Sequence, residues 1–313
     1  MIEELLTAGV RVGTPLALAA IGEAIAEQGG VINLGIEGAM LAGALGAAMG
    51  ASAAGPAAGV GVAILAGTAT AAVFAAVAIG AKANQIITGT AVTLLMTGLT
   101  GLIARQFFGA AGAGLSLPTL APVPIPELSR IPLLGEVFFD QSLLTYVSYL
   151  LVPLATWLTF RTRFGLELRA SGESSSAASA AGVRVDRIRT IGVLIGGATA
   201  GLAGASLVLV QVGTFTERMT AGRGFIAIAI VVLGRKHPVG VALAALLFGG
   251  ATAVQFVVQA GGSGLPYQLW QALPYLLALG VLATSTGNEK REARRLRLGS
   301  GGPPEEDRLS ERA

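Results

Sequence analysis

The sequence predicts an all-α polytopic membrane protein with about eight or nine transmembrane segments, one of them short or broken. Two features of the composition favour this fold class. Hydrophobic residues make up 53% of the 313 residues, and charged residues make up only 12%, about half the share of a globular domain. In addition, the apolar residues are gathered in long runs, as a bilayer core about 30 Å thick requires. A soluble domain of this length could not bury so much apolar surface.

The apolar runs fill most of residues 1–286, which we expect to form the transmembrane domain. In order, they cover residues 5–25, 39–54, 57–81, 86–105, 143–160, 188–212, 225–233, 239–259 and 269–284. About seven of them are long enough to cross a bilayer alone. The run at 39–54 is short. The run at 225–233 can cross only if the irregular backbone before it completes the passage.

The positions of lysine and arginine predict the orientation, because cytoplasmic loops of membrane proteins are enriched in both. The loop 161–189 is the richest: it holds Arg161, Arg163, Arg169, Arg184, Arg187 and Arg189. We therefore expect this loop to be cytoplasmic, together with the turn at Arg235 and Lys236. The proline-rich stretch 107–141 then lies outside, as does the N-terminus if the run at 39–54 crosses fully.

The two ends of the chain differ in composition. The N-terminal residues MIEELL are acidic and lack the basic region of a signal peptide, so we expect them to remain in the mature protein. Residues 287–313 are charged and contain GSGGPPEED, a composition that cannot bury a core. We predict a disordered cytoplasmic tail.

Several classes of function find no support in the residues. Cysteine is absent, which excludes disulfides and thiolate metal sites, and His237 is the only histidine. No nucleophile–base pair stands out and no cofactor motif is present, so we expect no enzymatic activity. No basic stripe interleaved with aromatic residues is present, so nucleic acid is not an expected partner. The P-loop pattern is also missing, so any ATPase that drives this protein is another polypeptide.

Asn33 and Glu37 interrupt the apolar segment INLGIEGAM, in which Gly35 and Gly38 could break a helix. A charged side chain at the bilayer centre costs roughly 2.5–3.5 kcal/mol even on the lenient insertion scale. Irregular backbone at that depth survives where it is buried in protein or lines a watery cavity. One interpretation is therefore a broken helix beside a translocation path. The alternative is an interfacial loop with Glu37 in water.

Other polar residues lie near the ends of the apolar runs. Asn84, Gln85 and Thr88 form a second candidate group for the path, although the start of a helix with Thr88 facing a neighbour is the simpler interpretation. Arg11 and Glu23 lie near the two ends of the first run, where snorkelling of the side chains to the membrane surface would accommodate them.

Small residues recur every four positions in two of the runs. The rows are Gly38, Ala42, Gly46 and Gly50, and Gly197, Gly201 and Ala205. Such rows let the backbones of membrane helices approach closely. Packing within one subunit is the simpler interpretation, and a conduit or a dimer seam is the alternative.

The loop 161–189 contains SGESSSAASAAG, which predicts a short helix. Ser171 could cap a helix that starts at Gly172, Glu173 would complement its positive end, and Gly182 suits the left-handed stop. Such a helix of about ten residues is too short to be stable alone in water. A slim face that could enter a groove is formed by Ala177, Ala178, Ala180 and Ala181. The alternative is a solvated loop without a partner.

Four stretches resemble the permease subunits of ATP-binding-cassette (ABC) importers for nucleosides, relatives of the simple-sugar and branched-chain amino-acid permeases. They are INLGIEGAMLAGA (32–44), ANQIITGTAVTLL (83–95), LRASGESSSAASAAGVRVDRIR (168–189) and GRGFIAIAIVVLGRKHPVG (222–240). They occur in the order and spacing of the family and span most of the chain. The third is similar to the cytoplasmic loop that contacts the ATPase.

The resemblance implies a type II-like importer fold, a location in a bacterial plasma or inner membrane, and a set of partners. These are two ATPase subunits, a second permease that is a longer homologue in a heterodimer, an external substrate-binding lipoprotein and the membrane lipid. It also implies that Gly172, Glu173, Ala177, Ala178, Ala181 and Gly182 contact the ATPase. The alternatives are a permease of the same family for simple sugars or branched-chain amino acids, an ion-coupled secondary transporter, and a membrane enzyme acting on lipids.

Overall fold

Seven of the predicted apolar runs form helices that are long and apolar enough to cross a membrane. The computed structural model describes residues 2–109, 116–132, 134–260 and 276, and these seven helices lie within that part of the chain. They are α1 (Ile2–Gln28), α2 (Ile36–Ala54), α3 (Pro56–Ala75), α4 (Gln85–Phe108), α6 (Leu143–Arg161), α9 (Val185–Ser206) and α11 (Pro238–Ala260). The π-helical segments η1 (Ala76–Gly80) and η3 (Leu207–Val212) continue α3 and α9.

The fold class is confirmed as a polytopic helical bundle, whereas the predicted count of spans is not. The last predicted run, 269–284, lies outside the described residues except for residue 276. The predicted tail at 287–313 lies outside them as well. The run predicted at 39–54 begins earlier, at Ile36, and the resulting α2 of 19 residues reaches spanning length.

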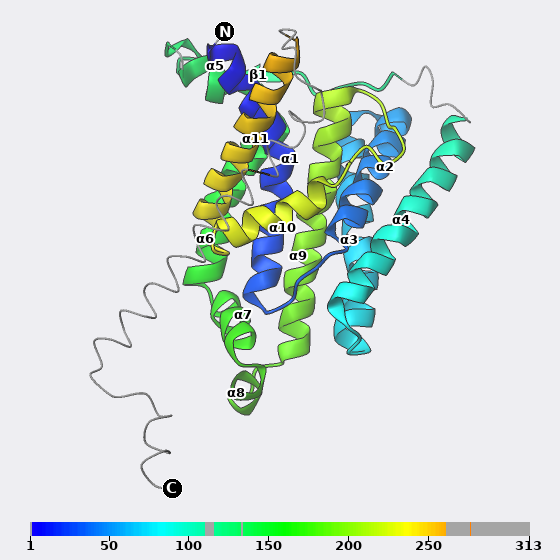
Figure 1. Cartoon of the computed structure of the whole chain (residues 1–313), viewed down its shortest axis with the longest axis vertical. Coiled ribbons are helices and arrows are strands. Elements are labelled where there is room, and N and C mark those ends of the chain that lie inside the picture. Colours follow the sequence, from blue (N-terminus) through cyan, green and yellow to red (C-terminus); the bar gives the residue numbers. More distant parts are fainter. Residues whose placement is uncertain (1, 110–115, 133, 261–275, 277–313) are drawn as a thin grey trace, which may run out of the picture.

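The short run at 225–233 becomes helix α10 (Arg223–Leu233), which lies across the bundle. In Figure 1, α10 runs at a steep angle to the upright helices α1 and α9. The chain descends from the end of η3 through irregular backbone at 213–222, follows α10, and reaches the start of α11. The path from η3 to α11 thus combines irregular backbone with a short helix, and its crossing of the membrane stays a prediction.

The remaining elements lie at the two ends of the bundle. One end carries the start of α1 and the proline-rich stretch, with β1 (Pro122–Pro124), η2 (Leu128–Arg130), α5 (Leu134–Phe139) and β2 (Asp140–Ser142). The two strands pair antiparallel, with Val123 opposite Gln141, a small departure from a purely helical fold. The opposite end carries α7 (Arg163–Glu173) and α8 (Ser175–Ala180), so the arginine-rich loop and the proline-rich stretch are on opposite sides (Figure 1).

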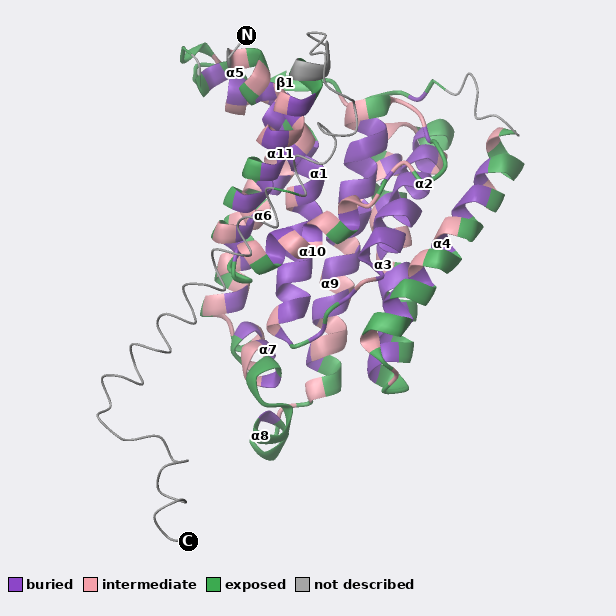
Figure 2. Cartoon of the chain, viewed as in Figure 1, coloured by how far each residue is buried: buried purple, intermediate pink, exposed green. Residues whose placement is uncertain are grey.

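Helix α2 is the most deeply buried of the seven long helices. In α2, 83% of the spanning window is buried, compared with 28% in α6, and Figure 2 shows α2 buried along its length while α4 and α6 expose their outer faces. Such burial within a small-residue helix requires close neighbours, and α2 packs against α3, α4 and α9. The exposed apolar faces of α4 and α6 suit contact with lipid or another subunit.

The small-residue rows pack within the subunit, which confirms the simpler interpretation. A Cβ atom added to Gly43 of α2 would lie 2.5 Å from the Cα of Gly201 in α9, and a Cβ on Gly201 would overlap the carbonyl oxygen of Ala63 in α3. Real Cβ atoms do not approach backbone so closely, so only glycine fits at Gly201. The three helices α2, α3 and α9 therefore meet backbone to backbone.

Candidate functional site

The predicted helix in the arginine-rich loop is divided into α7 and α8. The predicted start at Gly172 with Ser171 as its cap is wrong, because both residues lie in the last turn of α7. The Ser171 side chain is buried, and its hydroxyl donates to the carbonyl oxygen of Glu167 at 2.7 Å. Ser174 caps α8 instead, and its Oγ accepts from the Ala177 backbone nitrogen at 3.3 Å. Several serines follow one another here, and local sequence alone does not choose between them.

The end of α8 follows the prediction. Gly182 adopts a left-handed conformation with φ of 87°, which glycine tolerates best. Its backbone nitrogen donates to the Ser179 carbonyl oxygen at 2.9 Å, and the Val183 nitrogen donates to that of Ala178 at 3.0 Å. These bonds satisfy carbonyl groups that the helix end would otherwise leave free.

Most of the predicted contact residues lie on the surface of this end of the molecule. The exposed members are Gly172, Glu173, Ala177, Ala181 and Gly182. Ala178 is only 4% exposed and contacts its own chain. Ala178 is the buried residue of α8, so Ala177 and the following Ala181, which are four residues apart, belong to a surface that is open to a partner.

Helix α7 is fastened to the end of α1 by backbone contacts. The Arg189 guanidinium on α9 donates to the Gly29 carbonyl oxygen at 2.8 Å and to the Ser171 carbonyl oxygen at 2.9 Å. Gly172 packs so closely that a Cβ atom there would overlap the carbonyl oxygen of Gln28. A displacement of α7 would therefore be transmitted to the end of α1.

A second contact joins α7 to the turn between α10 and α11. The Arg169 guanidinium lies 5.0 Å from the centre of the Phe160 ring at the end of α6. The same ring stacks on His237, with the ring centres 5.0 Å apart. The only histidine thus has a structural contact at the base of the bundle.

Asn33 lies in a buried hairpin between α1 and α2. Its backbone nitrogen donates to Oε1 of Glu23 at 2.8 Å, and its side-chain oxygen accepts from the Gly35 nitrogen at 3.0 Å. Gln85 reinforces the hairpin, since its side-chain oxygen accepts from the Ile32 nitrogen at 3.0 Å. The expectation that Glu23 snorkels to the surface is wrong, because Glu23 is fully buried and serves as an acceptor for this hairpin.

Glu37 joins α2 to the start of α10. Its Oε1 accepts from the Thr220 hydroxyl at 2.6 Å and from the Gly222 nitrogen at 2.9 Å, and its Oε2 accepts from the Gly224 nitrogen at 2.6 Å. The alternative that placed Glu37 in water is wrong, because the residue is only 7% exposed. The carboxylate supplies the acceptors that the first amides of α10 need, since that helix has no side-chain cap of its own.

The second polar group is a helix start, as one interpretation predicted. Asn84 caps α4, and its side-chain oxygen accepts from the nitrogens of Ile86 and Ile87 at 3.0 and 3.1 Å. Thr88 is buried against its neighbours, with 6% exposure. Asn84 is exposed and Gln85 is half-buried, so these two are the predicted path residues that a solute could approach.

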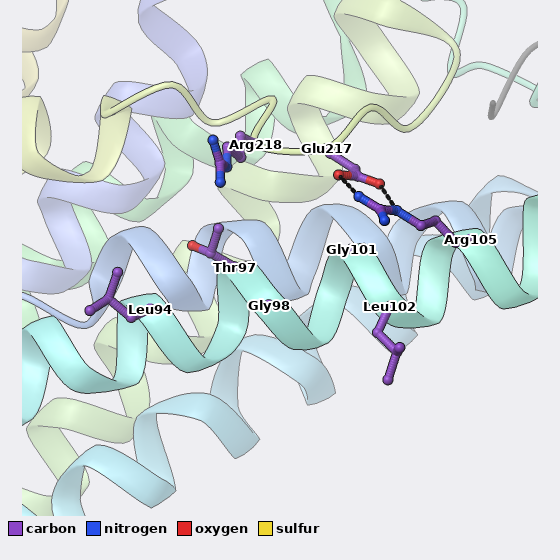
Figure 3. A pocket seen from close by; sticks show the side chains of 8 residues that line it. All are labelled: Leu94, Thr97, Gly98, Gly101, Leu102, Arg105, Glu217 and Arg218. Carbon is purple, nitrogen blue, oxygen red and sulfur yellow. Dashed lines mark hydrogen bonds and ion pairs between the residues drawn. The ribbon is translucent and has the colours of Figure 1, made fainter. Parts of the chain in front are cut away.

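A pocket of about 430 Å³ lies between α4 and the irregular segment 213–222 (Figure 3). Its lining residues are Leu94, Thr97, Gly98, Gly101, Leu102 and Arg105 from α4, and Glu217 and Arg218 from the segment. Figure 3 shows Leu94 and the Arg105–Glu217 pair at opposite ends of this row. The pocket combines apolar, hydroxyl and charged groups on one side of the bundle.

A two-pronged ion pair closes one end of the pocket. Arg105 donates from Nε to Oε1 of Glu217 at 2.6 Å and from Nη2 to Oε2 at 2.9 Å (Figure 3). The hydrogen bond from Arg105 holds the pKa of the Glu217 carboxyl below its ordinary value. The pair is exposed, so it joins α4 to the segment 213–222 at the protein surface.

The described residues contain no group of three or more His, Cys, Asp or Glu side chains that could hold a metal ion. The polar residues of these clusters form hydrogen bonds, caps and ion pairs between helices.

Comparison with known proteins decides the family. Residues 5–282 match the model of the family described as the permease component of the branched-chain amino acid transport system. The chain belongs to this family. The matched region contains all four stretches on which the resemblance was based, and the chain is thus the membrane-embedded permease component of an ABC transporter.

Three relatives cover most of this permease. It is 41% identical over 256 residues to a putative glucose ABC transporter permease of Haloferax volcanii, covering 80% of this chain and 76% of the relative. It is 33% identical over 287 residues to a nucleoside ABC transporter permease of Lactococcus lactis, covering 88% and 89%. It is 34% identical over 280 residues to a guanosine ABC transporter permease of Bacillus subtilis, covering 86% of each chain. No solved structure matches the chain.

Sequence reasoning missed the charged pocket of this permease. Arg105 was placed at the end of a span without a role, and Glu217 and Arg218 were not considered. A usable signal was present, because Glu217 and Arg218 are adjacent charges in a short irregular stretch between two apolar runs.

Proposed function

We propose that this permease belongs to an importer of nucleosides. The observation that carries the proposal is the match to the Lactococcus lactis nucleoside permease, which extends over 88% of this chain and 89% of the relative. The guanosine permease of Bacillus subtilis supports the same class of solute over a similar length. The second candidate is a sugar, favoured by the 41% identity to the putative glucose permease.

The importer would combine this chain with separate subunits. ATPase subunits would dock at the end that carries α7 and α8, where the exposed contact residues gather. A substrate-binding protein would deliver the solute at the end that carries β1 and β2. A second permease would cover part of the exposed apolar surface, and a longer homologue in a heterodimer is the arrangement we favour. Alternating access would follow when ATP-driven movement of the ATPases shifts α7 and α8.

The path within the importer would run along α4. Asn84 and Gln85 lie near its start, on the side of the molecule that carries α8. Asn33, Glu37 and Thr88 are buried in this conformation, and they would line the path only if the bundle opens around them.

Uptake by the reconstituted importer tests the function. The permease is copurified with its partner subunits and placed in vesicles with ATP inside, and the uptake of labelled guanosine, uridine, glucose and leucine is compared. We expect ATP-dependent uptake of the nucleosides in preference to glucose and leucine. Uptake of glucose without nucleosides would replace the proposed solute by the sugar. Uptake that follows an ion gradient and ignores ATP would contradict the importer itself.

A further inference from the structure

The pocket beside α4 has the size and lining of a site for a small amphipathic solute. Its volume of about 430 Å³ falls within the range of roughly 300–1,000 Å³ that is typical of small-molecule sites. Leu94 and Leu102 supply apolar contacts, and Thr97 supplies a hydroxyl. The Thr97 hydroxyl donates to the Thr93 carbonyl oxygen at 2.8 Å, so its oxygen can still accept a hydrogen bond from a solute.

The wall of the pocket on α4 is open because two of its residues are glycines. A Cβ atom added to Gly98 would meet nothing within 4 Å, and one added to Gly101 would lie 3.6 Å from the carboxyl group of Glu217. At most other glycines of the bundle, an added Cβ atom would meet neighbouring backbone, as at Gly43 and Gly201. The space beside Gly98 is therefore not required by helix packing.

The Arg105–Glu217 pair has the properties of a reversible closure. Its side chains are 65% and 44% exposed, and an ion pair so exposed to its surroundings contributes little to stability. The two-pronged geometry nevertheless specifies one closed arrangement of α4 against the segment 213–222. A weak but geometrically specific contact can open and close without large cost.

The chemistry of the pair suggests what could open it. Both oxygens of Glu217 are occupied by the parallel donors of Arg105. Two hydroxyl groups on neighbouring carbons, as in a ribose, also present two parallel donors and can bind the same carboxylate. The freed Arg105 and the adjacent Arg218 can then donate to acceptors of the solute, and a guanidinium plane can stack on an aromatic base.

We propose that this pocket is a solute site in the permeation path and that the Arg105–Glu217 pair is its gate, opened when the paired hydroxyls of a ribosyl solute replace Arg105 on Glu217. The proposal rests on the proposed nucleoside import and specifies where that solute binds. It assigns Glu217 as a residue that touches the solute, and Gly98 as a position that leaves room for it.

A thiol-labelling experiment tests the site, because the chain has no cysteine of its own. Gly98→Cys is compared with Gly61→Cys, which lies on α3 and also faces open space. The complete importer is treated with a methanethiosulfonate reagent, and nucleoside uptake is measured before labelling, after labelling and after reduction. We expect labelled Gly98→Cys to lose about tenfold or more of its uptake and to recover it on reduction, while Gly61→Cys and the parent stay within about twofold.

Protection gives an independent readout on the same folded protein. We expect a nucleoside to slow the labelling of Gly98→Cys without affecting that of Gly61→Cys. If labelled Gly98→Cys transports as well as labelled Gly61→Cys and the nucleoside gives no protection, the pocket is not on the path. Because each variant is its own control before labelling, a folding defect cannot mimic the result.

The gate is tested by the preference for hydroxylated solutes. Uptake of a ribonucleoside is divided by uptake of its 2′,3′-dideoxy analogue, in the parent importer and in Glu217→Gln. The parent importer and the variant use the same binding protein, so the selectivity of the binding protein cancels when the two ratios are compared. We expect the ratio to fall about tenfold in Glu217→Gln. An unchanged ratio would remove Glu217 from contact with the solute, even if total uptake fell.

Failure of the proposed function can be told from failure of this proposal. If the parent importer takes up glucose and no nucleoside, the nucleoside function is wrong. The labelling experiment is then repeated with glucose, which also has neighbouring hydroxyls. Block and protection with glucose would retain the pocket, whereas their absence with a transported solute would overturn the pocket and its gate.

Discussion

Glu37 connects two parts of the chain that are far apart in sequence. It lies in the first turn of α2, and the hydroxyl that it accepts from, on Thr220, is 183 residues away. Its two oxygens hold three donors at the start of α10, a helix without a side-chain cap. The carboxylate therefore replaces the water that would solvate these amides in a soluble protein.

Removing this acceptor should destabilise the bundle. In Glu37→Gln, the amide group would bring its own donors toward backbone N–H groups, leaving at least one hydrogen bond unmade. We expect a loss of about 2 kcal/mol or more, because hydrogen bonds to charged groups contribute about 1.5–3 kcal/mol. The measurement is thermal unfolding of the detergent-solubilised protein, with Glu173→Gln on the surface of α7 as the matched control. Equal unfolding temperatures for the two variants would contradict the capping role.

Glu217 determines the pH range in which the Arg105 pair stays closed. The hydrogen bond from Arg105 lowers the pKa of the Glu217 carboxyl from its ordinary value of 4.5. Since the folded-state pKa is the lower one, the stabilising contribution is complete above pH 4.5 and is lost as the pH falls through the folded-state pKa. The pair should be closed throughout the neutral range.

Spin labels on either side of the Arg105–Glu217 pair can measure whether the pair is closed at a given pH. Labels at Ala91→Cys on α4 and Thr216→Cys on the segment 213–222 avoid the pair itself. We expect their distance distribution to be constant from pH 8 to about pH 5 and to broaden only below the usual range of a glutamate. With Glu217→Gln added, the distribution should be broad at every pH. Broadening of the parent that begins near pH 7 would refute the assignment.

At the scale of the elements, the bundle is built on glycine contacts between α2, α3 and α9. These contacts bring backbones together in an environment where lipid offers no hydrophobic force between helices. The prediction of small-residue rows succeeded because the four-residue spacing is a local property of the sequence. Which rows meet could not be predicted, because that depends on how α9 crosses α2 and α3.

A large side chain at the centre of this crossing should separate the helices. In Gly201→Leu, the new side chain would collide with the backbone of α3 at Ala63 and Ile64. We expect a loss of at least about 1–3 kcal/mol, the usual cost of overpacking, and a lower unfolding temperature in detergent. Gly61→Leu adds the same side chain to α3 in open space and should unfold close to the parent. If Gly201→Leu is as stable as Gly61→Leu, the close crossing is wrong.

At the scale of the whole molecule, α7 and α8 form the part that ATPase subunits could displace. Arg189 and Gly172 fasten α7 to the end of α1, and the stack of Arg169, Phe160 and His237 fastens it to the turn before α11. A displacement of α7 would reach the buried hairpin at Asn33 through α1. The same movement would reach α10 through the turn.

Charged residues on the exposed face of α8 should separate ATP hydrolysis from transport. We expect Ala177→Glu with Ala181→Glu to abolish solute uptake while the protein still enters the membrane, because the carboxylates would be buried against the ATPase. Ala81→Glu, which is exposed at the same end of the molecule, should transport normally. Uptake and ATPase activity are measured on the complete importer. Normal uptake by the double variant would show that α8 is not the contact.

Local sequence predicted the apolar spans, the helix start near Asn84 and the stop at Gly182, because run length and helix ends depend on neighbouring residues. It did not predict the burial of Glu23 and Glu37, whose environments are made by other parts of the chain. It also missed the pair of Arg105 and Glu217, which are 112 residues apart. Contacts of this kind become visible only when the helices are placed beside one another.

The capping of α10 by Glu37 has a consequence for the order of assembly during synthesis. An 11-residue helix is too short to be recognised as a span on its own, so the insertion machinery would not place it. Helix α2 emerges first, with a carboxylate whose three donors have not yet been translated. The entry of α10 therefore waits for an earlier helix to be in position, and the last steps of folding take place after the long spans have been inserted.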